Sequence, residues 1–338
     1  MFSFQNFLDL PLIWFGLIAT ALFLYVLLDG FDLGVGILFP FAPSDQCRDR
    51  MMNSIAPFWD GNETWLVLSG GGLLAAFPLA YAILMPAFYV PVIIMLLGLI
   101  FRGVAFEFRF KADKSRILWD RAFNFGSITA ALMQGVILGA FVQGVAVEGR
   151  NFSGGPFDWL NAYSLMAGVA LVFGYGLLGS TWLVMKTDGI TQEWARKCAL
   201  FMLGLVGLFL AAVSISMPLM NPDIKALWFS TPNFYRLLPI PLVAAICFSL
   251  IWFDLRQGHE HRPFFVSMGI FLAAYVWLGV SLWPWLVPFQ ITFRQAAASG
   301  PSQSLLLVGT VIMLPVVLTY TAYCYYVFRG KASHEGVY

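Results

Sequence analysis

The chain has few charged residues and almost no histidine. Only 11% of its 338 residues are Asp, Glu, Lys or Arg, whereas 60% are hydrophobic and 17% are aromatic. No soluble domain of this length can bury so much apolar surface, so the composition predicts a polytopic membrane protein. The few basic residues are spread over several loops and mixed with acids, which argues against nucleic acid as a partner.

None of the three histidines stands in an apolar segment. His259 and His261 share one polar loop, and His334 lies in the C-terminal tail. A metal or haem in the bilayer core normally requires imidazole or thiolate ligands. The four cysteines are scattered without a C-x-x-C pair, so we expect no metal site in this chain. Haem ligation by methionine is the less favoured alternative, and any redox cofactor is expected to be held mainly by another chain.

Long apolar runs dominate the rest of the sequence. A bilayer-spanning helix needs about 20 apolar residues, and we predict nine such helices. They cover residues 11–30, 60–79, 80–101, 122–145, 162–185, 198–218, 237–254, 264–284 and 305–328. We expect an all-α polytopic membrane protein with a single integral membrane domain, residues 1–338. Its helices are expected to form two four-helix bundles and one additional helix.

The basic residues fall mostly on one side of this arrangement. Fifteen of the 19 Lys and Arg residues lie at the ends of the predicted helices that share one side, and four lie on the other side. By the positive-inside rule, the N-terminus is outside and the C-terminus is cytoplasmic. An odd number of spans agrees with termini on opposite sides.

Ionisable residues stand at the ends of the first three apolar runs. Asp29 with Asp32, and Asp60 with Glu63, are spaced i, i+3, so each pair shares one face of a helix. A charge in hydrocarbon costs several kcal/mol, so such residues usually face a protein interior, a partner charge or a water-filled path. Arg102 lies at a similar depth, which predicts ion pairing with the acids.

Structural explanations exist for the same residues. Acids near a helix start, such as Asp60 and Glu63, gain from the helix dipole. The side chain of Arg102 could reach lipid headgroups by snorkelling. Gly34 and Gly36 are expected to allow close helix packing. Against the capping explanation, two tryptophans and an asparagine surround the acids, which favours a polar pocket walled by indole rings.

Several segments resemble subunit II of the cytochrome bd family of quinol oxidases. The resemblance is densest over residues 20–110. It comprises residues 29–36, 53–57, Trp59-Asp60-Gly61-Asn62, Trp65-Leu66, Phe101-Arg102, Phe106-Glu107 and, in the last apolar run, residues 320–325. The order of these motifs along the predicted topology makes the combination specific.

The resemblance implies a subunit that ligates no haem and is not catalytic alone. In this family, subunit I holds two haems b and one haem d, together with the loop that oxidises ubiquinol or menaquinol. The complex reduces O2 to water with cytoplasmic protons and so generates a proton motive force in the bacterial inner membrane. Subunit II stabilises subunit I, contributes a carboxylate to a proton path, contacts lipid and can bind a structural quinone. A small single-helix accessory subunit is compatible with this assembly.

The resemblance also assigns roles to individual residues. Asp60 is the candidate proton-path carboxylate, with Asp29 and Glu63 as further candidates. Asp32 and Arg102 are expected to pair. Glu107 is expected on the same buried, haem-facing side as Asp32 and Arg102. Packing against the partner or a quinone is expected for Trp59, Asn62 and Trp65.

The main alternative is a proton-coupled secondary transporter, because intramembrane acids and glycine-interrupted helices are typical of such carriers. Carriers usually repeat their broken helices in two halves, whereas here the acids are concentrated in the first three runs. A purely structural membrane scaffold is a third hypothesis, but it leaves the buried charges at matched depth without a role.

Overall fold

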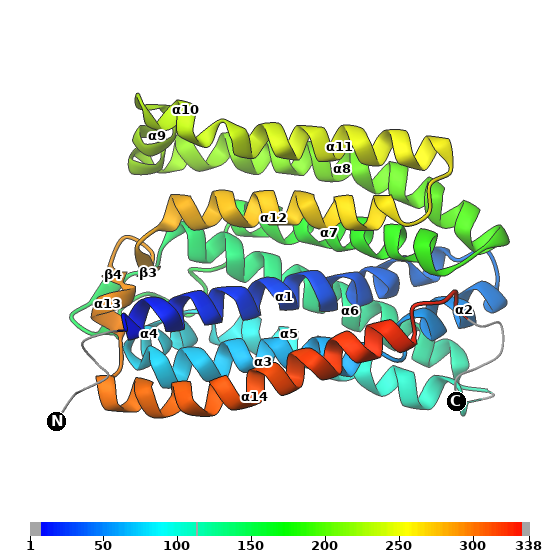
Figure 1. Ribbon diagram of the computed structural model, residues 1–338, viewed down its shortest axis with the longest axis horizontal. Helices are drawn as coiled ribbons and strands as arrows, with labels where there is room; N and C mark the ends of the chain where they lie inside the picture. Colours follow the sequence, from blue (N-terminus) through cyan, green and yellow to red (C-terminus); the bar gives the residue numbers. More distant parts are fainter. Residues whose placement is uncertain (1–7, 113, 333–338) are drawn as a thin grey trace.

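The computed structural model describes residues 8–112 and 114–332 as a bundle of long helices that run side by side (Figure 1). Eight helical segments of this part are long and apolar enough to cross a membrane. They are α1 (Leu10–Leu38) with the 3-10 turn η2 (Phe39–Phe41), α5 (Tyr89–Arg109), α6 (Arg116–Gln143), α7 (Ala162–Lys186), α8 (Gly189–Met220), α10 (Asn233–Leu237) with α11 (Pro239–Gln257), α12 (Arg262–Leu282) and α14 (Gly300–Val327). The prediction of an all-helical polytopic membrane protein is confirmed.

Short elements lie at the two ends of the bundle. At one end, α2 (Asp45–Ile55) follows the first span, and at the other end lie α9 (Pro222–Phe229) and α13 (Phe293–Ala296) (Figure 1). Two antiparallel hairpins complete the fold. They pair β1 (Val147–Glu148) with β2 (Asn151–Phe152), and β3 (Trp285–Val287) with β4 (Ile291–Thr292).

The second predicted span is less apolar than a typical membrane helix. It corresponds to α3 (Trp59–Ala76), which is 18 residues long. Asp60, Asn62 and Glu63 occupy its first turns, and α3 is therefore not among the eight apolar segments. Its polar residues are stabilised by contacts with neighbouring helices, described below, which composition alone does not reveal.

The third predicted span, residues 80–101, is divided. The chain forms the short helix α4 (Pro78–Ala87), breaks at Phe88 and continues as α5. Because α5 extends to Arg109, Arg102 lies two turns inside the helix and not at its end. Asp29 and Asp32 likewise lie inside α1, which continues to Leu38.

Glycine allows α1 to approach α7 closely. A Cβ atom at Gly34 would overlap the carbonyl oxygen of Tyr175, and one at Gly179 would overlap the backbone of Gly34. On another face of α1, a Cβ atom at Gly36 would overlap the Ser127 hydroxyl. The prediction that Gly34 and Gly36 serve close packing is confirmed, and α1 contacts α3, α6 and α7 (Figure 1).

We therefore expect Gly34→Ala to destabilise the protein by about 1–3 kcal/mol, because the added methyl group forces α1 and α7 apart. Gly204→Ala in α8 is the matched control, since a Cβ atom there meets open space. Thermal unfolding of the purified protein should show a lower midpoint for Gly34→Ala only. Equal midpoints for the two variants would contradict this packing account.

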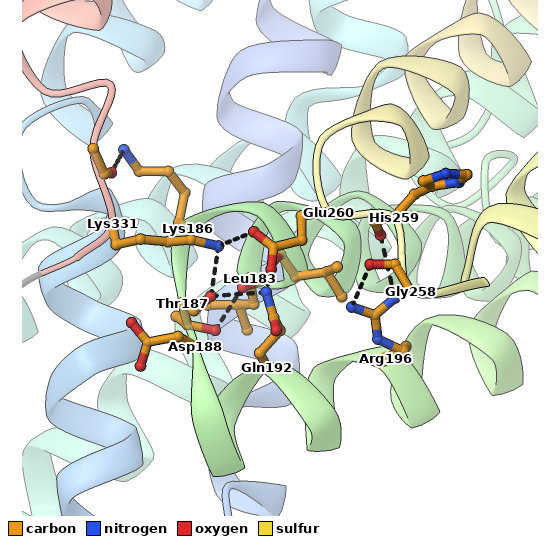
Figure 2. A network of polar contacts seen from close by, with 12 residues as sticks. Leu183, Lys186, Thr187, Asp188, Gln192, Arg196, Gly258, His259, Glu260 and Lys331 are labelled. Atoms are coloured by element: carbon orange, nitrogen blue, oxygen red, sulfur yellow. Dashed lines mark hydrogen bonds and ion pairs between the residues drawn. The ribbon is translucent and has the colours of Figure 1, made fainter. Parts of the chain in front are cut away.

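Hydrogen bonds hold Lys331 and Ala332, near the C-terminus, at the end of the bundle that carries α2. Lys331 Nζ donates to Glu260 Oε2 at 2.7 Å and to the Thr187 carbonyl at 2.9 Å (Figure 2). The Ala332 amide donates to the Lys186 carbonyl at 2.7 Å. The Lys331 ammonium holds the pKa of Glu260 below its usual value. This contact therefore stabilises the fold at neutral pH and is lost as the pH falls through the lowered pKa.

Candidate functional site

A polar cluster lies between α1, α3 and α5, and Arg102 is its centre. The Arg102 side chain is fully buried. Its Nη2 donates to Asp29 Oδ1 at 2.7 Å and to Glu63 Oε2 at 3.0 Å. One guanidinium thus joins α5 to both other helices, and the predicted ion pairing of Arg102 with the acids is confirmed.

The partner predicted for Arg102 was wrong, because it pairs with Asp29 and Glu63 and not with Asp32. Asp32 lies one turn further along α1, where its Oδ2 accepts a hydrogen bond from Asn62 Nδ2 at 2.7 Å. Residues spaced i, i+3 share a face but differ by about 4.5 Å along the helix axis. The axial register between α1 and α5 therefore selects Asp29.

Asn62 connects the cluster to the last helix. It donates to the Leu28 carbonyl at 3.2 Å, and its Oδ1 accepts a hydrogen bond from the Tyr325 hydroxyl of α14 at 2.9 Å. Asn62 is only 1% exposed. Its contacts therefore lie within this chain, and the expected packing of Asn62 against a partner or a quinone is corrected. The pairing with Tyr325 spans 263 residues of sequence, so no local pattern could predict it.

The two tryptophans line the cluster in different ways. Trp59 stacks on Phe106 with ring centroids 5.0 Å apart, and the Arg102 guanidinium lies 5.4 Å from the Trp59 ring. Trp65 is 3% exposed and packs with Ala21 and Tyr25 of α1. Trp65 was expected to pack against the partner or a quinone, but it is buried within this chain. Trp59 forms an indole wall beside Arg102, as the sequence suggested.

Glu107 does not belong to the buried charges. Its side chain is 53% exposed and lies 3.6 Å from Lys111. Glu107 follows Arg102 by five positions, and this offset turns it about 140° around α5 relative to Arg102. Arg109, seven residues after Arg102, returns to the buried face and pairs with Asp49 at 2.6 Å and with Asp120. The i, i+7 spacing of the two arginines could have revealed this second buried cation.

The acids form a gradient from surface to interior. Asp60 is exposed, the Glu63 side chain is 30% exposed and the Asp29 side chain is fully buried. Three carboxyl groups, those of Asp29, Asp32 and Glu63, surround the single Arg102 cation. A buried site with more acids than bases is able to hold a proton.

Several buried atoms of the cluster have no hydrogen-bond partner within the described residues. They are Asp29 Oδ2, Asp32 Oδ1, Trp65 Nε1 and both Nε and Nη1 of Arg102. Buried polar atoms are normally paired with protein or with ordered water. The cluster therefore presents donors and acceptors suited to bound water.

Further polar side chains, which the sequence analysis did not single out, continue beyond Asp29. Gln134 Nε2 donates to the Tyr25 hydroxyl at 2.5 Å, and the Tyr175 hydroxyl donates to Gln134 Oε1 at 2.7 Å. Tyr25 precedes Asp29 by one turn of α1. An isolated Gln within an apolar run was the only signal in the sequence.

The chain offers no obvious metal ligands in the part that the structure describes. No group of three His, Cys, Asp or Glu side chains there is placed to hold a metal ion. His259 lies in the loop before α12, and its Nδ1 is 2.9 Å from Oδ1 of Asp254 in α11. His334 lies outside the described residues.

Comparisons with known proteins agree over nearly the whole length. Residues 10–328 match the family model described as cytochrome bd terminal oxidase subunit II. The chain is 31% identical to cytochrome bd ubiquinol oxidase subunit 2 of Bacillus subtilis, covering 96% of this chain and 97% of the relative. It is 30% identical to cytochrome bd-I ubiquinol oxidase subunit 2 of Escherichia coli K12, covering 97% and 96%. A chain of the bd oxidase from Geobacillus thermodenitrificans has the same fold, with a TM-score of 0.70 at 18% identity and coverage of 95% and 99%.

Proposed function

The chain belongs to the cytochrome bd terminal oxidase subunit II family, and from this premise we propose that it supplies part of the route by which protons reach the oxygen site of the complex. It is a subunit of a terminal oxidase and a multi-pass membrane protein of the bacterial respiratory chain. Family membership implies haems in the complex, with subunit I and quinol as partners.

The donor set of this chain does not fit a haem in the bilayer. His259 and His261, the histidines of the described residues, lie in the loop between α11 and α12. We therefore place the two haems b, the haem d, O2 reduction and the quinol-oxidising loop in subunit I. A structural quinone on this chain and a small accessory subunit stay predictions of the family resemblance.

The observation that carries the proton route is the shared ion pair of Arg102. Glu63 is partly exposed and touches the same guanidinium nitrogen as the fully buried Asp29. A proton taken up at exposed Asp60 thus has an acceptor nearby in Glu63, and the unpaired atoms of Asp29 and Asp32 favour water between them. The Arg102 cation lowers the free-energy cost of burying ionised carboxylates. The cluster can therefore lose and regain a proton while the protein stays folded.

The basic residues suggest how the chain is oriented. We place the end of the bundle with α2 in the cytoplasm, because that end carries most of the Lys and Arg residues. Asp60 and Glu63, in the first turns of α3, then lie on the proton-supplying side. We count α3 as a ninth span that crosses beside α1 and α14, and we retain the arrangement of two four-helix bundles and one additional helix in a single domain.

One face of α3 suggests where subunit I binds. Asp60, Thr64, Val67, Gly71 and Leu74 are exposed at helical spacing. A Cβ atom at Gly71 would meet no neighbour within 4 Å. Lipid gives no reason for exposed glycine and carboxylate within a span, whereas a close helix partner does. A large interface on this face would also stabilise subunit I.

The experiment that tests this function uses a tag on this chain. The purified complex should show b- and d-type haem bands in a reduced-minus-oxidised spectrum and should consume O2 with quinol. An untagged strain, processed in the same way, is the control. A colourless preparation without a second large subunit would contradict the oxidase assignment and favour the transporter hypothesis.

A further inference from the structure

The end of the bundle opposite α2 carries an arginine that the proton route does not use. Arg150 stands at the turn of the β1–β2 hairpin, after Gly149, whose φ of 63° suits a tight turn. The hairpin packs against α4. It connects α6 to α7, so Arg150 lies at the end of two membrane spans, where headgroups of lipids are found.

Arg150 lines a cavity of about 340 Å³. Asn151 of the hairpin and Gln295 of α13 contribute amide groups, and Pro78 and Ala82 of α4 contribute an apolar wall. Gln295 Oε1 accepts hydrogen bonds from the Thr292 amide and hydroxyl at 2.8 and 2.9 Å. Among the described residues, the Gln295 Nε2 group has no hydrogen-bond acceptor, so it can donate to a ligand.

A second cavity, of about 400 Å³, lies further along the same stretch of chain. Met85, Pro86, Tyr89 and Val90 line it, together with Pro156 from the segment that follows the hairpin. Pro78 and Met85 are seven residues apart, about 10 Å along a helix. A cavity that carries a cation and two amide groups is thus followed along α4 by a cavity lined almost wholly by apolar side chains. This order matches a ligand with a charged head and an apolar tail.

The charge of Arg150 is not neutralised within the chain as described. No acidic side chain of the described residues lies within ion-pair distance of it. In contrast, Arg294, at the same end of the bundle, pairs with Asp9 at 2.5 and 3.1 Å. An unpaired cation at headgroup level attracts anionic lipid.

We propose that these two cavities bind one anionic phospholipid. The Arg150 guanidinium pairs with the lipid phosphate, Asn151 and Gln295 hydrogen-bond to the headgroup, and the first part of an acyl chain lies against Met85 and Tyr89. A neutral isoprenoid ligand would leave the Arg150 charge unpaired, so the chemistry favours a phosphodiester.

Native mass spectrometry of the delipidated oxidase complex, titrated with phosphatidylglycerol or with zwitterionic phosphatidylcholine, tests the site. We expect phosphatidylglycerol to bind more tightly, and Arg150→Gln to weaken its binding by about tenfold. Arg236→Gln is the matched control, because Arg236 is exposed on α10 at the same end but outside the cavity (Figure 1). Ala82→Trp, which fills the cavity from an exposed position, should reduce binding of both lipids.

Three results would overturn the proposal. The first is equal affinity of the wild-type complex for both lipids. The second is unchanged phosphatidylglycerol binding in both Arg150→Gln and Ala82→Trp. The third is full displacement of the lipid by glycerol phosphate at comparable concentration, because the site would then recognise a free anion and not a lipid.

Discussion

Replacement of Arg102 by leucine is expected to remove most of the assembled, haem-containing oxidase from the membrane. The variant leaves Asp29 and Glu63 without their shared cation, and Asp29 is fully buried. Breaking a buried ion pair by removing one partner costs about 3–5 kcal/mol. Haem content per tagged subunit, together with the thermal unfolding midpoint, measures the effect.

Two further variants make the Arg102 result specific. Lys111→Leu removes a cation just beyond α5 whose pairing with Glu107 is exposed, and we expect it to change stability by less than about 1 kcal/mol. The double variant Arg102→Leu with Asp29→Asn removes both charges of the buried pair and should recover part of the haem content. If the Arg102→Leu complex assembled as well as the Lys111→Leu complex, the buried ion pair would not be required for assembly of the oxidase.

Replacement of Asp60 by asparagine should leave assembly intact but lower quinol oxidase turnover by at least about tenfold. Asp60 is exposed in this chain, and asparagine has the same size and shape as aspartate, so the substitution leaves the packing of this α3 face on subunit I unchanged. The amide cannot accept and release a proton, so the first step of the proposed route is blocked. O2 uptake with quinol, normalised to haem content, is the measurement.

Glu107→Gln provides the matched control for Asp60→Asn. Glu107 is an exposed acid of α5 near the same end of the bundle and lies outside the cluster. We expect full turnover in this variant. Equal turnover of the two variants at equal haem content would remove Asp60 from the proton route.

The sequence predicted which residues gather but not how they pair. Contact between Asp29, Glu63 and Arg102 was expected because an unpaired charge in hydrocarbon costs several kcal/mol of free energy. This expectation follows from the composition of the chain and the depth of the three residues alone. The pairing of Arg102 with Asp29 in place of Asp32 depends on the axial register of α1 against α5, about one helical turn, which no local pattern encodes.

Two other differences have related causes. The family resemblance assigned Glu107 to the buried side together with Arg102, whereas α5 continues to Arg109 and its helical turn directs Glu107 outward. Tyr325 was missed because its bond to Asn62 joins the second predicted span to the last one. The packing role of a glycine was predictable where it faces the backbone of another helix, as at Gly34, because only a residue without a Cβ atom fits there.

The central claim is that protons for O2 reduction pass through this chain at Asp60. The most direct test is the rate of proton uptake during quinol-driven O2 reduction by complexes reconstituted in liposomes, compared between wild type and Asp60→Asn at equal haem content. We predict that the variant reduces its haems normally but takes up protons, and builds a membrane potential, at least about tenfold more slowly. Proton uptake and membrane potential at the wild-type rate in a fully assembled Asp60→Asn complex would contradict the account.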